Sequence, residues 1–251
     1  MVFSWSFTSD ETSHPASGDA TVSSITDACR TDSYRTYLIS EDPLVIYIES
    51  FVTPEEASQL TDLSESKFKP SPLWSDDGKV SFNTNYRSSL TASLERQYLI
   101  KCIESRARSF PFYLSPSDSL IKPLVVQRYG PTNQYRDHYD WFTDSPTLDG
   151  NIDSTFFVYI QANCTGGGTN FPRLKALEDE KWCKWVDCDQ ELGAGVTFRP
   201  ITGNAIFWRN LDAQGKGLKS TLHAGLPVTE GMKTGLNIWT WVRYDRAISE
   251  L

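Results

Sequence analysis

The second half of the chain is built from short runs of β-branched and aromatic residues, separated by clusters of Gly, Asn, Asp and Pro. Runs of this kind are typical of β-strands, and the clusters between them mark turns. Many short strands in succession favour a barrel or a roll of two sheets. We expect strands at Leu124–Tyr129, Ser154–Gln161, Val196–Arg199, Ala205–Arg209, Ser220–Gly225 and Leu236–Val242.

The first half predicts an arm followed by supporting helices. Residues 1–42 are rich in Ser, Thr, Asp and Glu without a clear period, so we expect an N-terminal arm that is mobile or loosely packed. The run from Leu44 to Ser50 predicts a strand, and Thr53-Pro54-Glu55-Glu56 predicts the start of a helix that ends near Ser66. A second helix is expected from about Ala92 to Phe110. Residues 43–251 then form a single domain.

Composition excludes several classes of protein. With 39% apolar residues and eight Trp, the 251-residue chain can build a sizeable core. The net charge of −8 comes with no run of Lys or Arg, so nucleic acid is not expected as a partner. The chain shows no membrane span and no secretory signal, which predicts no membrane partner and a cytoplasmic location. The sequence does not indicate an oligomeric state.

The five Cys residues do not resemble a disulfide framework, because they are odd in number and mostly scattered. Cys183 and Cys188, in WCKWVDC, are the exception. They could form a small disulfide loop or half of a zinc site, but no second Cys pair or nearby His completes a tetrahedral set. Plain thiols or a local bridge are therefore expected.

Two of the three His residues stand where they could bind a metal ion. In RDHYDWF, His138 and Asp140 are two residues apart, so on an extended strand both side chains leave the same face and can share one ion. An acid two residues after a His is common by chance, and this pair alone is weak evidence. His223 can supply the third ligand of the two-His, one-carboxylate face that binds non-haem iron. The alternative for His223 is a buried His that is hydrogen-bonded near a strand end.

A lysine follows the second candidate His. Lys233 comes ten residues after His223, across a turn marked by Gly and Pro. A hairpin there would bring its ammonium alongside the metal strand, where it could bind the distal carboxylate of a dicarboxylic cofactor. Tyr129 and Thr169 could add neutral hydrogen bonds to that carboxylate. The alternative for Lys233 is a solvated surface charge.

These segments together resemble the prolyl 4-hydroxylase type of Fe(II)/2-oxoglutarate dioxygenase. VQRYGPTNQYRDHYDWF is similar to that family's metal-binding strand, and TFFVYIQANCTGGGTNFP to its strand, double-Gly turn and Thr-x-Phe-Pro element. The spacing of His223, Lys233 and Trp239 resembles that of the distal ligand, the cofactor lysine and a pocket tryptophan. Arg87-Ser88-Ser89 resembles an Arg-Thr-Ser segment upstream. The likeness runs from about Pro43 to Arg243.

The resemblance implies a mainly β fold with flanking helices, a double-stranded β-helix that is one kind of cupin-like jelly roll. It also implies Fe(II), 2-oxoglutarate and O₂ as cofactors, with ascorbate as a reductant. 2-Oxoglutarate would be converted to succinate and CO₂ while an unactivated C–H bond of the substrate is hydroxylated or otherwise oxidised. The residues carried over as iron ligands are His138, Asp140 and His223. Those carried over to the 2-oxoglutarate pocket are Lys233, Tyr129, Thr169 and Trp239.

One departure from the family concerns the substrate. Where peptide hydroxylases of this type carry an Arg before the strand that begins near Ser154, this chain has Ile152 and Asp153. The substrate can therefore be a small molecule as well as a peptidyl or prolyl residue. Two other functions compete: a cupin-like metal-binding protein without oxidative turnover, and an inactive interaction module. Lys233 argues against the cupin-like protein, which has no need for a cation ten residues after the distal His.

Overall fold

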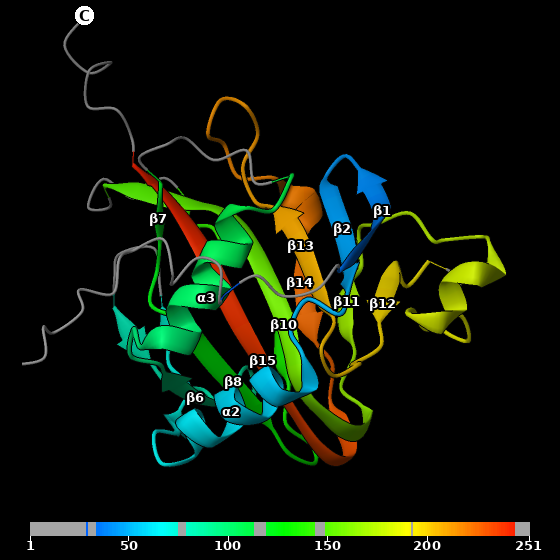
Figure 1. Cartoon of the computed structure of the whole chain (residues 1–251). Coiled ribbons are helices and arrows are strands. Elements are labelled where there is room, and N and C mark those ends of the chain that lie inside the picture. The colour runs from blue at the N-terminus through cyan, green and yellow to red at the C-terminus, as the bar shows by residue number, and fades with distance from the viewer. Residues whose placement is uncertain are drawn as a thin grey trace, which may run out of the picture.

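The computed structural model describes Cys29 and residues 34–74, 79–112, 119–143, 149–191 and 193–243. Two antiparallel sheets make up most of it (Figure 1). The larger sheet has nine strands, in the order β1 (Arg35–Glu41), β2 (Leu44–Glu49), β13 (Ala205–Arg209), β10 (Gly150–Gly166), β15 (Val228–Arg243), β8 (Val125–Tyr129), β6 (Leu90–Ser93) and β3 (Lys69–Pro70), while β7 (Leu120–Ile121) pairs with β15.

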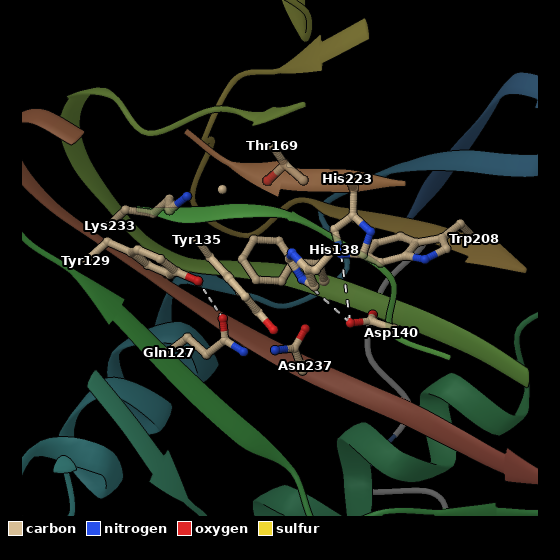
Figure 2. Close-up of a pocket in the computed structure, with 12 residues that line it drawn as sticks. Gln127, Tyr129, Tyr135, His138, Asp140, Thr169, Trp208, His223, Lys233 and Asn237 are labelled. Carbon is tan, nitrogen blue, oxygen red and sulfur yellow. Dashed lines mark hydrogen bonds and ion pairs between the residues drawn. The ribbon is translucent and has the colours of Figure 1, made fainter. Parts of the chain in front are cut away.

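The smaller sheet has four strands, in the order β12 (Val196–Phe198), β11 (Thr169–Phe171), β14 (His223–Gly225) and β9 (Tyr135–His138). The other short elements are a hairpin of β4 (Leu73–Trp74) and β5 (Val80–Ser81) and the 3-10 turns η1 (Glu180–Lys184) and η2 (Lys219–Thr221). The mainly β jelly roll that the sequence predicts is confirmed. Side chains of both sheets meet in the space that holds the residues of Figure 2.

Two helices cover the outer face of the larger sheet (Figure 1). Helix α2 (Pro54–Glu65) begins as predicted, because Thr53 and Glu56 form a reciprocal capping box. Helix α3 (Tyr98–Arg108) buries Ile100 and Ile103 in the same apolar cluster as Leu60 of α2. This apolar core packs against the outer face of the long strands. Side chains on the inner face of the same strands are therefore available to form a site.

The predicted second helix is too long at its N-terminus. Leu90–Ser93 forms β6, and the helix begins only after Gln97. Ala92 pairs with Val126 of β8 and is buried. The segment therefore forms a strand, although its apolar spacing alone favoured a helix. Tertiary pairing thus decides between two local patterns.

The two central strands are longer than predicted. β10 has 17 residues and β15 has 16, and they pair along almost their whole length. The expected strands Ser154–Gln161 and Leu236–Val242 are their apolar parts. The remaining parts contain Gly, Asn, Thr and Glu, which local reasoning reads as turns. Of the expected strand at Ser220–Gly225, only His223–Gly225 is extended, because Lys219–Thr221 forms a 3-10 turn.

Part of the expected N-terminal arm belongs to the sheet. Arg35–Glu41 forms β1 and pairs with β2, with Tyr37 opposite Tyr47. The expected domain start at residue 43 therefore falls inside a hairpin. Residues 1–28 and 30–33 of the expected arm lie outside the described residues.

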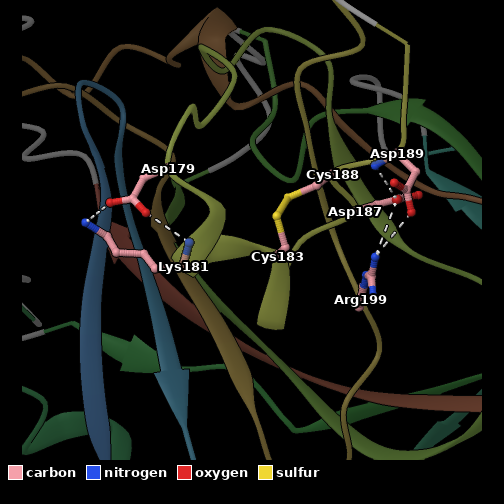
Figure 3. The surroundings of a disulfide bond; sticks show 7 residues. All are labelled: Asp179, Lys181, Cys183, Asp187, Cys188, Asp189 and Arg199. Atoms are coloured by element: carbon pink, nitrogen blue, oxygen red, sulfur yellow. Dashed lines mark hydrogen bonds and ion pairs between the residues drawn. A yellow bond between two sulfur atoms is a disulfide. The ribbon is translucent and has the colours of Figure 1, made fainter.

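Two disulfides are present among the described residues, although the Cys residues do not resemble a disulfide framework in the sequence. Cys183 and Cys188 close a small loop between η1 and β12 (Figure 3), which is the local bridge considered from sequence. Cys29 and Cys102, 73 residues apart, form a second bridge that sequence spacing did not indicate. Cys164 is free. No helix among the described segments is long and apolar enough to cross a bilayer.

Candidate active site

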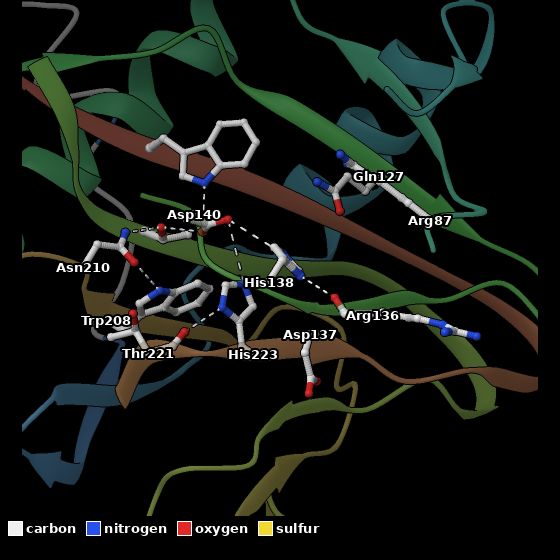
Figure 4. A network of polar contacts seen from close by, with 12 residues as sticks. Arg87, Gln127, Arg136, Asp137, His138, Asp140, Trp208, Asn210, Thr221 and His223 are labelled. Carbon is white, nitrogen blue, oxygen red and sulfur yellow. Dashed lines mark hydrogen bonds and ion pairs between the residues drawn. The ribbon is translucent and has the colours of Figure 1, made fainter. Parts of the chain in front are cut away.

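Three candidate metal ligands converge between the two sheets. His138 ends β9, His223 begins β14, and these two residues are directly paired in the smaller sheet. Asp140 follows β9, and its Oδ1 lies 3.9 Å from Nε2 of His138 and 3.8 Å from Nε2 of His223 (Figure 4). The three ligand atoms all lie within 4.8 Å of one another. Two imidazole nitrogens and one carboxylate oxygen suit a divalent transition metal. Three ligands on one face of such a metal would leave its opposite face free for other ligands.

Backbone carbonyls orient both imidazoles. Nδ1 of His138 lies 2.8 Å from the carbonyl oxygen of Arg136, and Nδ1 of His223 lies 2.9 Å from that of Thr221. Because a carbonyl only accepts, each Nδ1 carries the hydrogen and each Nε2 presents a lone pair. Burial, followed by the neighbouring His223, holds the pKa of His138 well below its usual range. His138 is therefore neutral at physiological pH, which is the form that binds a metal.

The carboxylate of Asp140 is held through its other oxygen. Thr155 Oγ1 donates to Oδ2 at 2.8 Å, and the indole Nε1 of Trp239 donates to it at 3.1 Å. Behind Thr155, the amide of Asn210 donates to Thr155 Oγ1 at 2.9 Å and accepts from Trp208 Nε1 at 2.9 Å (Figure 4). This chain fixes the rotation of the carboxylate, so Oδ1 is the oxygen turned toward the two imidazoles.

The position of Trp239 differs from the expectation. It was assigned to the 2-oxoglutarate pocket, but its indole nitrogen contacts Asp140 instead, and it does not line the cavity beside the triad. A strand position whose side chain faces inward could serve either purpose. Sequence spacing places the residue on the right face without deciding its partner.

A cavity runs from the triad to Lys233 (Figure 2). Tyr129 and Thr169, both expected from sequence, line it. Residues that line it without having been expected are Gln127, Tyr135, Phe157, Trp208, Gly225 and Asn237. A usable signal for Gln127 and Asn237 was strand alternation, since Gln127 is two residues before Tyr129 and Asn237 is four after Lys233.

Lys233 is a fully buried cation at the far end of the cavity. Its side chain has no exposed surface, and its Nζ donates to the carbonyl of Gly167 at 2.6 Å and lies 4.4 Å from the ring centre of Tyr129. It takes part in no ion pair with the described acids. Desolvation lowers the pKa of Lys233 to about 8. A buried ammonium without a counter-ion is costly, and it is typical of a site for an anionic ligand.

The surroundings of Lys233 leave room for such a ligand. Thr169 accepts a hydrogen bond from Tyr159 Oη at 2.8 Å, which leaves its own hydroxyl hydrogen to donate. Gly225 keeps the space open, because a Cβ there would lie 3.7 Å from both Lys233 Nζ and Tyr129 Oη. The ammonium and two hydroxyls thus lie around one small volume.

The segment that departs from the family is buried. Asp153 is 4% exposed and accepts a hydrogen bond from Nη2 of Arg209 at 2.9 Å. Ile152 is also buried within β10. Of the two residues that stand where an Arg is expected in peptide hydroxylases, one is therefore a buried apolar side chain and the other is an acid that is bound by an arginine of β13.

Comparison with known proteins agrees with this geometry. A family model described as the 2OG-Fe(II) oxygenase superfamily matches residues 124–241. Probable prolyl 4-hydroxylase 7 of Arabidopsis thaliana is 25% identical over 228 residues, which cover 87% of this chain and 69% of that protein. Prolyl 4-hydroxylase 13 of the same plant is 28% identical over 207 residues, covering 80% of this chain and 72% of that protein.

A solved structure shares the fold. The viral collagen prolyl hydroxylase of Paramecium bursaria Chlorella virus-1, determined as a 2OG complex, has a TM-score of 0.58 and 24% identity, covering 79% of this chain and 96% of that chain. The sequence matches extend well beyond the metal-binding segments into the supporting strands and helices. Fold, donor set and sequence similarity therefore all support a 2OG-Fe(II) oxygenase of the prolyl 4-hydroxylase type.

Proposed function

We propose that this oxygenase hydroxylates a residue of a peptide, with a prolyl residue as the first candidate, and converts 2-oxoglutarate to succinate and CO₂. In this proposal His138, Asp140 and His223 hold Fe(II). Lys233 and Thr169 donate hydrogen bonds to the distal carboxylate of 2-oxoglutarate, and Tyr129, whose hydroxyl donates to Gln127, packs beside it. The observation that carries the proposal is a buried, unpaired ammonium in the same cavity as the triad.

The described residues fit the metal and the co-substrate. When bound, Fe(II) with 2-oxoglutarate and O₂ supplies the oxidising power for an unactivated C–H bond. The protein's part is to fix the donor atoms: backbone carbonyls set both imidazoles, and Thr155 and Trp239 set the carboxylate. Lys233 offers a charge-assisted hydrogen bond to a carboxylate, which is about twice as strong as a neutral one.

Aromatic residues keep the site ordered. The ring of Tyr135 stacks on His138 with centroids 3.5 Å apart, and Phe171 stacks on His223 at 5.4 Å. Trp208 packs edge-on against His223 at 4.8 Å. These contacts hold the ligands in one rotamer and exclude water from their flanks, which favours a single reactive geometry.

The peptide substrate rests on the relatives, which are named prolyl 4-hydroxylases. A small-molecule substrate is the second candidate. The observation in its favour is the buried Ile152 and the Arg209-bound Asp153, which leave no free arginine at the position where peptide hydroxylases carry one. Both candidates share the co-substrate chemistry.

The disulfides indicate the redox state of the compartment in which the protein works. The sequence predicted a cytoplasmic location, but the bridges Cys183–Cys188 and Cys29–Cys102 favour an oxidising compartment, since disulfides are rare in reducing ones. We therefore infer that the chain works in an oxidising environment.

The proposal is tested by incubating the purified protein anaerobically with Fe(II) and 2-oxoglutarate. We expect a visible metal-to-ligand charge-transfer band in the wild type. Lys233→Ala should lose the band while retaining iron, whereas Lys184→Ala, which removes a lysine that is 60% exposed, should keep it. Absence of the band in the wild type would refute the proposal. Peptides and metabolites can then be screened for succinate release and for the mass increase of one added oxygen atom.

A further inference from the structure

Two carboxamide side chains lie in the cavity between Lys233 and the triad. Gln127 of β8 and Asn237 of β15 are each only 4% exposed, and both line the cavity (Figure 2). Buried polar groups normally have hydrogen-bond partners, and a group without one calls for an explanation. These two amides line the same cavity as the triad and Lys233, and the proposed function assigns neither.

Gln127 has a free donor. Its Oε1 accepts a hydrogen bond from Tyr129 Oη at 2.6 Å. A phenol hydroxyl needs an acceptor, so this bond fixes the oxygen of the amide toward Tyr129 and turns the Nε2 hydrogens the other way. Among the described residues, no hydrogen bond of Nε2 of Gln127 is found. Its position next to the cavity lets those hydrogens reach a ligand.

Asn237 lies nearer the triad. Lys233, Asn237 and Trp239 occupy alternate inner positions of β15, and Trp239 donates to Asp140. With a rise of about 3.3 Å per residue, Asn237 is about 13 Å along the strand from Lys233 and about 7 Å from Trp239. Within the described part of the chain, the side chain of Asn237 forms no hydrogen bond.

Gly235 explains why both amides can face one ligand. It lies between Lys233 and Asn237 and is paired with Gln127. A Cβ at Gly235 would come within 2.3 Å of the ring of Phe157, so no side chain fits there. Phe157 of β10, which is paired with Asn237, instead places its ring over this gap in β15 and lines the cavity.

Resting on the proposed function, we propose that Asn237 and Gln127 bind the 2-oxo acid end of 2-oxoglutarate by donating N–H hydrogen bonds to its C1 carboxylate. Lys233 is the only Lys or Arg among the residues that line the cavity. One cation serves one carboxylate of a dicarboxylate, and neutral donors are then left for the end that also meets the metal. Asn237, nearer the triad, is the principal donor.

Co-substrate binding is measured without turnover by anaerobic calorimetry on the Mn(II)-loaded protein. We expect Asn237→Leu to raise the Kd for 2-oxoglutarate about tenfold or more, because a hydrogen bond to a charged group is lost. Asn237→Asp, nearly identical in size, should raise it further by repelling the carboxylate. Gln127→Leu should have a smaller effect in the same direction. The Kd for Mn(II) alone should stay within about twofold of wild type.

Gln161→Leu is the matched control. This carboxamide lies on β10 outside the cavity and accepts from Thr234 Oγ1 at 2.9 Å. Its loss tests whether removing any amide from this sheet weakens binding. We expect the Kd for 2-oxoglutarate to be unchanged.

The end of the co-substrate that is contacted is tested with 2-oxopentanoate, which has a methyl group in place of the distal carboxylate. Its Kd should rise in Asn237→Leu and should be insensitive to Lys233→Ala. If wild type binds 2-oxoglutarate and both Asn237 variants bind it equally well, the inference falls and the proposed function stands. If wild type does not bind 2-oxoglutarate at all, the proposed function itself falls. Should Asn237→Leu fail to fold, Asn237→Asp decides by the same criterion.

Discussion

Replacing Lys233 with methionine should stabilise the metal-free protein while removing its binding of 2-oxoglutarate. Burial lowers the pKa of Lys233 from 10.5 to about 8. At 1.36 kcal/mol per pKa unit, the charged lysine costs the folded state about 3 kcal/mol at pH 7. Methionine has a similar volume, but the carbonyl of Gly167 loses its donor, which costs about 1 kcal/mol. The expected net gain in free energy of unfolding is about 2 kcal/mol.

The gain depends on pH in a direction set by the pKa of Lys233. Between about pH 8 and pH 10.5 the unfolded lysine holds a proton that the folded one has lost, so the free energy of unfolding of wild type rises with pH in that window. The charge cost falls from about 3 kcal/mol at pH 7 to about 2 kcal/mol at pH 9 and almost disappears by pH 10.5. The advantage of the methionine variant should shrink accordingly.

Urea unfolding of both proteins at pH 7 and pH 9, without metal or 2-oxoglutarate, measures this difference. Other groups titrate in the same range, but the comparison of wild type with Lys233→Met cancels them. Lys184→Met, at an exposed position, is the control and should change stability little. The reasoning is refuted if Lys233→Met is less stable than wild type at pH 7, or if the difference between them does not depend on pH.

Three further outcomes are expected. His138→Ala should abolish succinate formation, and turnover at the wild-type rate would mean that the metal assignment is wrong. Thr155→Val removes the hydroxyl that orients the carboxylate of Asp140, so it should weaken Mn(II) affinity about 10-fold to 100-fold with the fold intact. Thr155→Ser should keep the affinity of the wild type. Equal affinity of all three proteins in calorimetry would exclude this positioning role. Peptide mapping without reduction should recover Cys183 joined to Cys188 and Cys164 alkylated, and a free Cys183 would contradict the structure.

The site was predictable where chemistry depends on local alternation. His138 and Asp140 share a face because they are two residues apart near the end of one strand, and the structure brings Asp140 to within 4 Å of both imidazoles. Lys233 was expected on a hairpin with the strand of His223, but that hairpin was wrong, because β14 and β15 lie in different sheets and do not pair with each other. Lys233 is nevertheless buried on the inner face of β15. Many short apolar runs favour a barrel or a roll of two sheets, and the jelly roll is one of these architectures.

What could not be predicted depends on contacts between distant segments. The bridge from Cys29 to Cys102 joins residues 73 apart, and no local pattern marks it. The start of α3 was misplaced because pairing with β8 captures Leu90–Ser93. Trp239 was placed on the correct face, yet only the position of Asp140 in space decides that its indole contacts a carboxylate of the triad.

The inner face of β15 carries residues at both ends of the site. Their orientation depends on the register in which β15 pairs with its neighbours. A slip of one residue along β15 would turn Lys233, Asn237 and Trp239 outward together. Residues 233–239 pair with β10 and β8 without any extra residue on β15. The irregularities in this region lie on β10, where Asp153 and Ile160 are skipped by the pairing. A bulge changes the direction of the side chains on the strand that contains it. Because these bulges lie on β10, side chains of β15 alternate without interruption from Lys233 to Trp239, which donates to the metal-binding carboxylate.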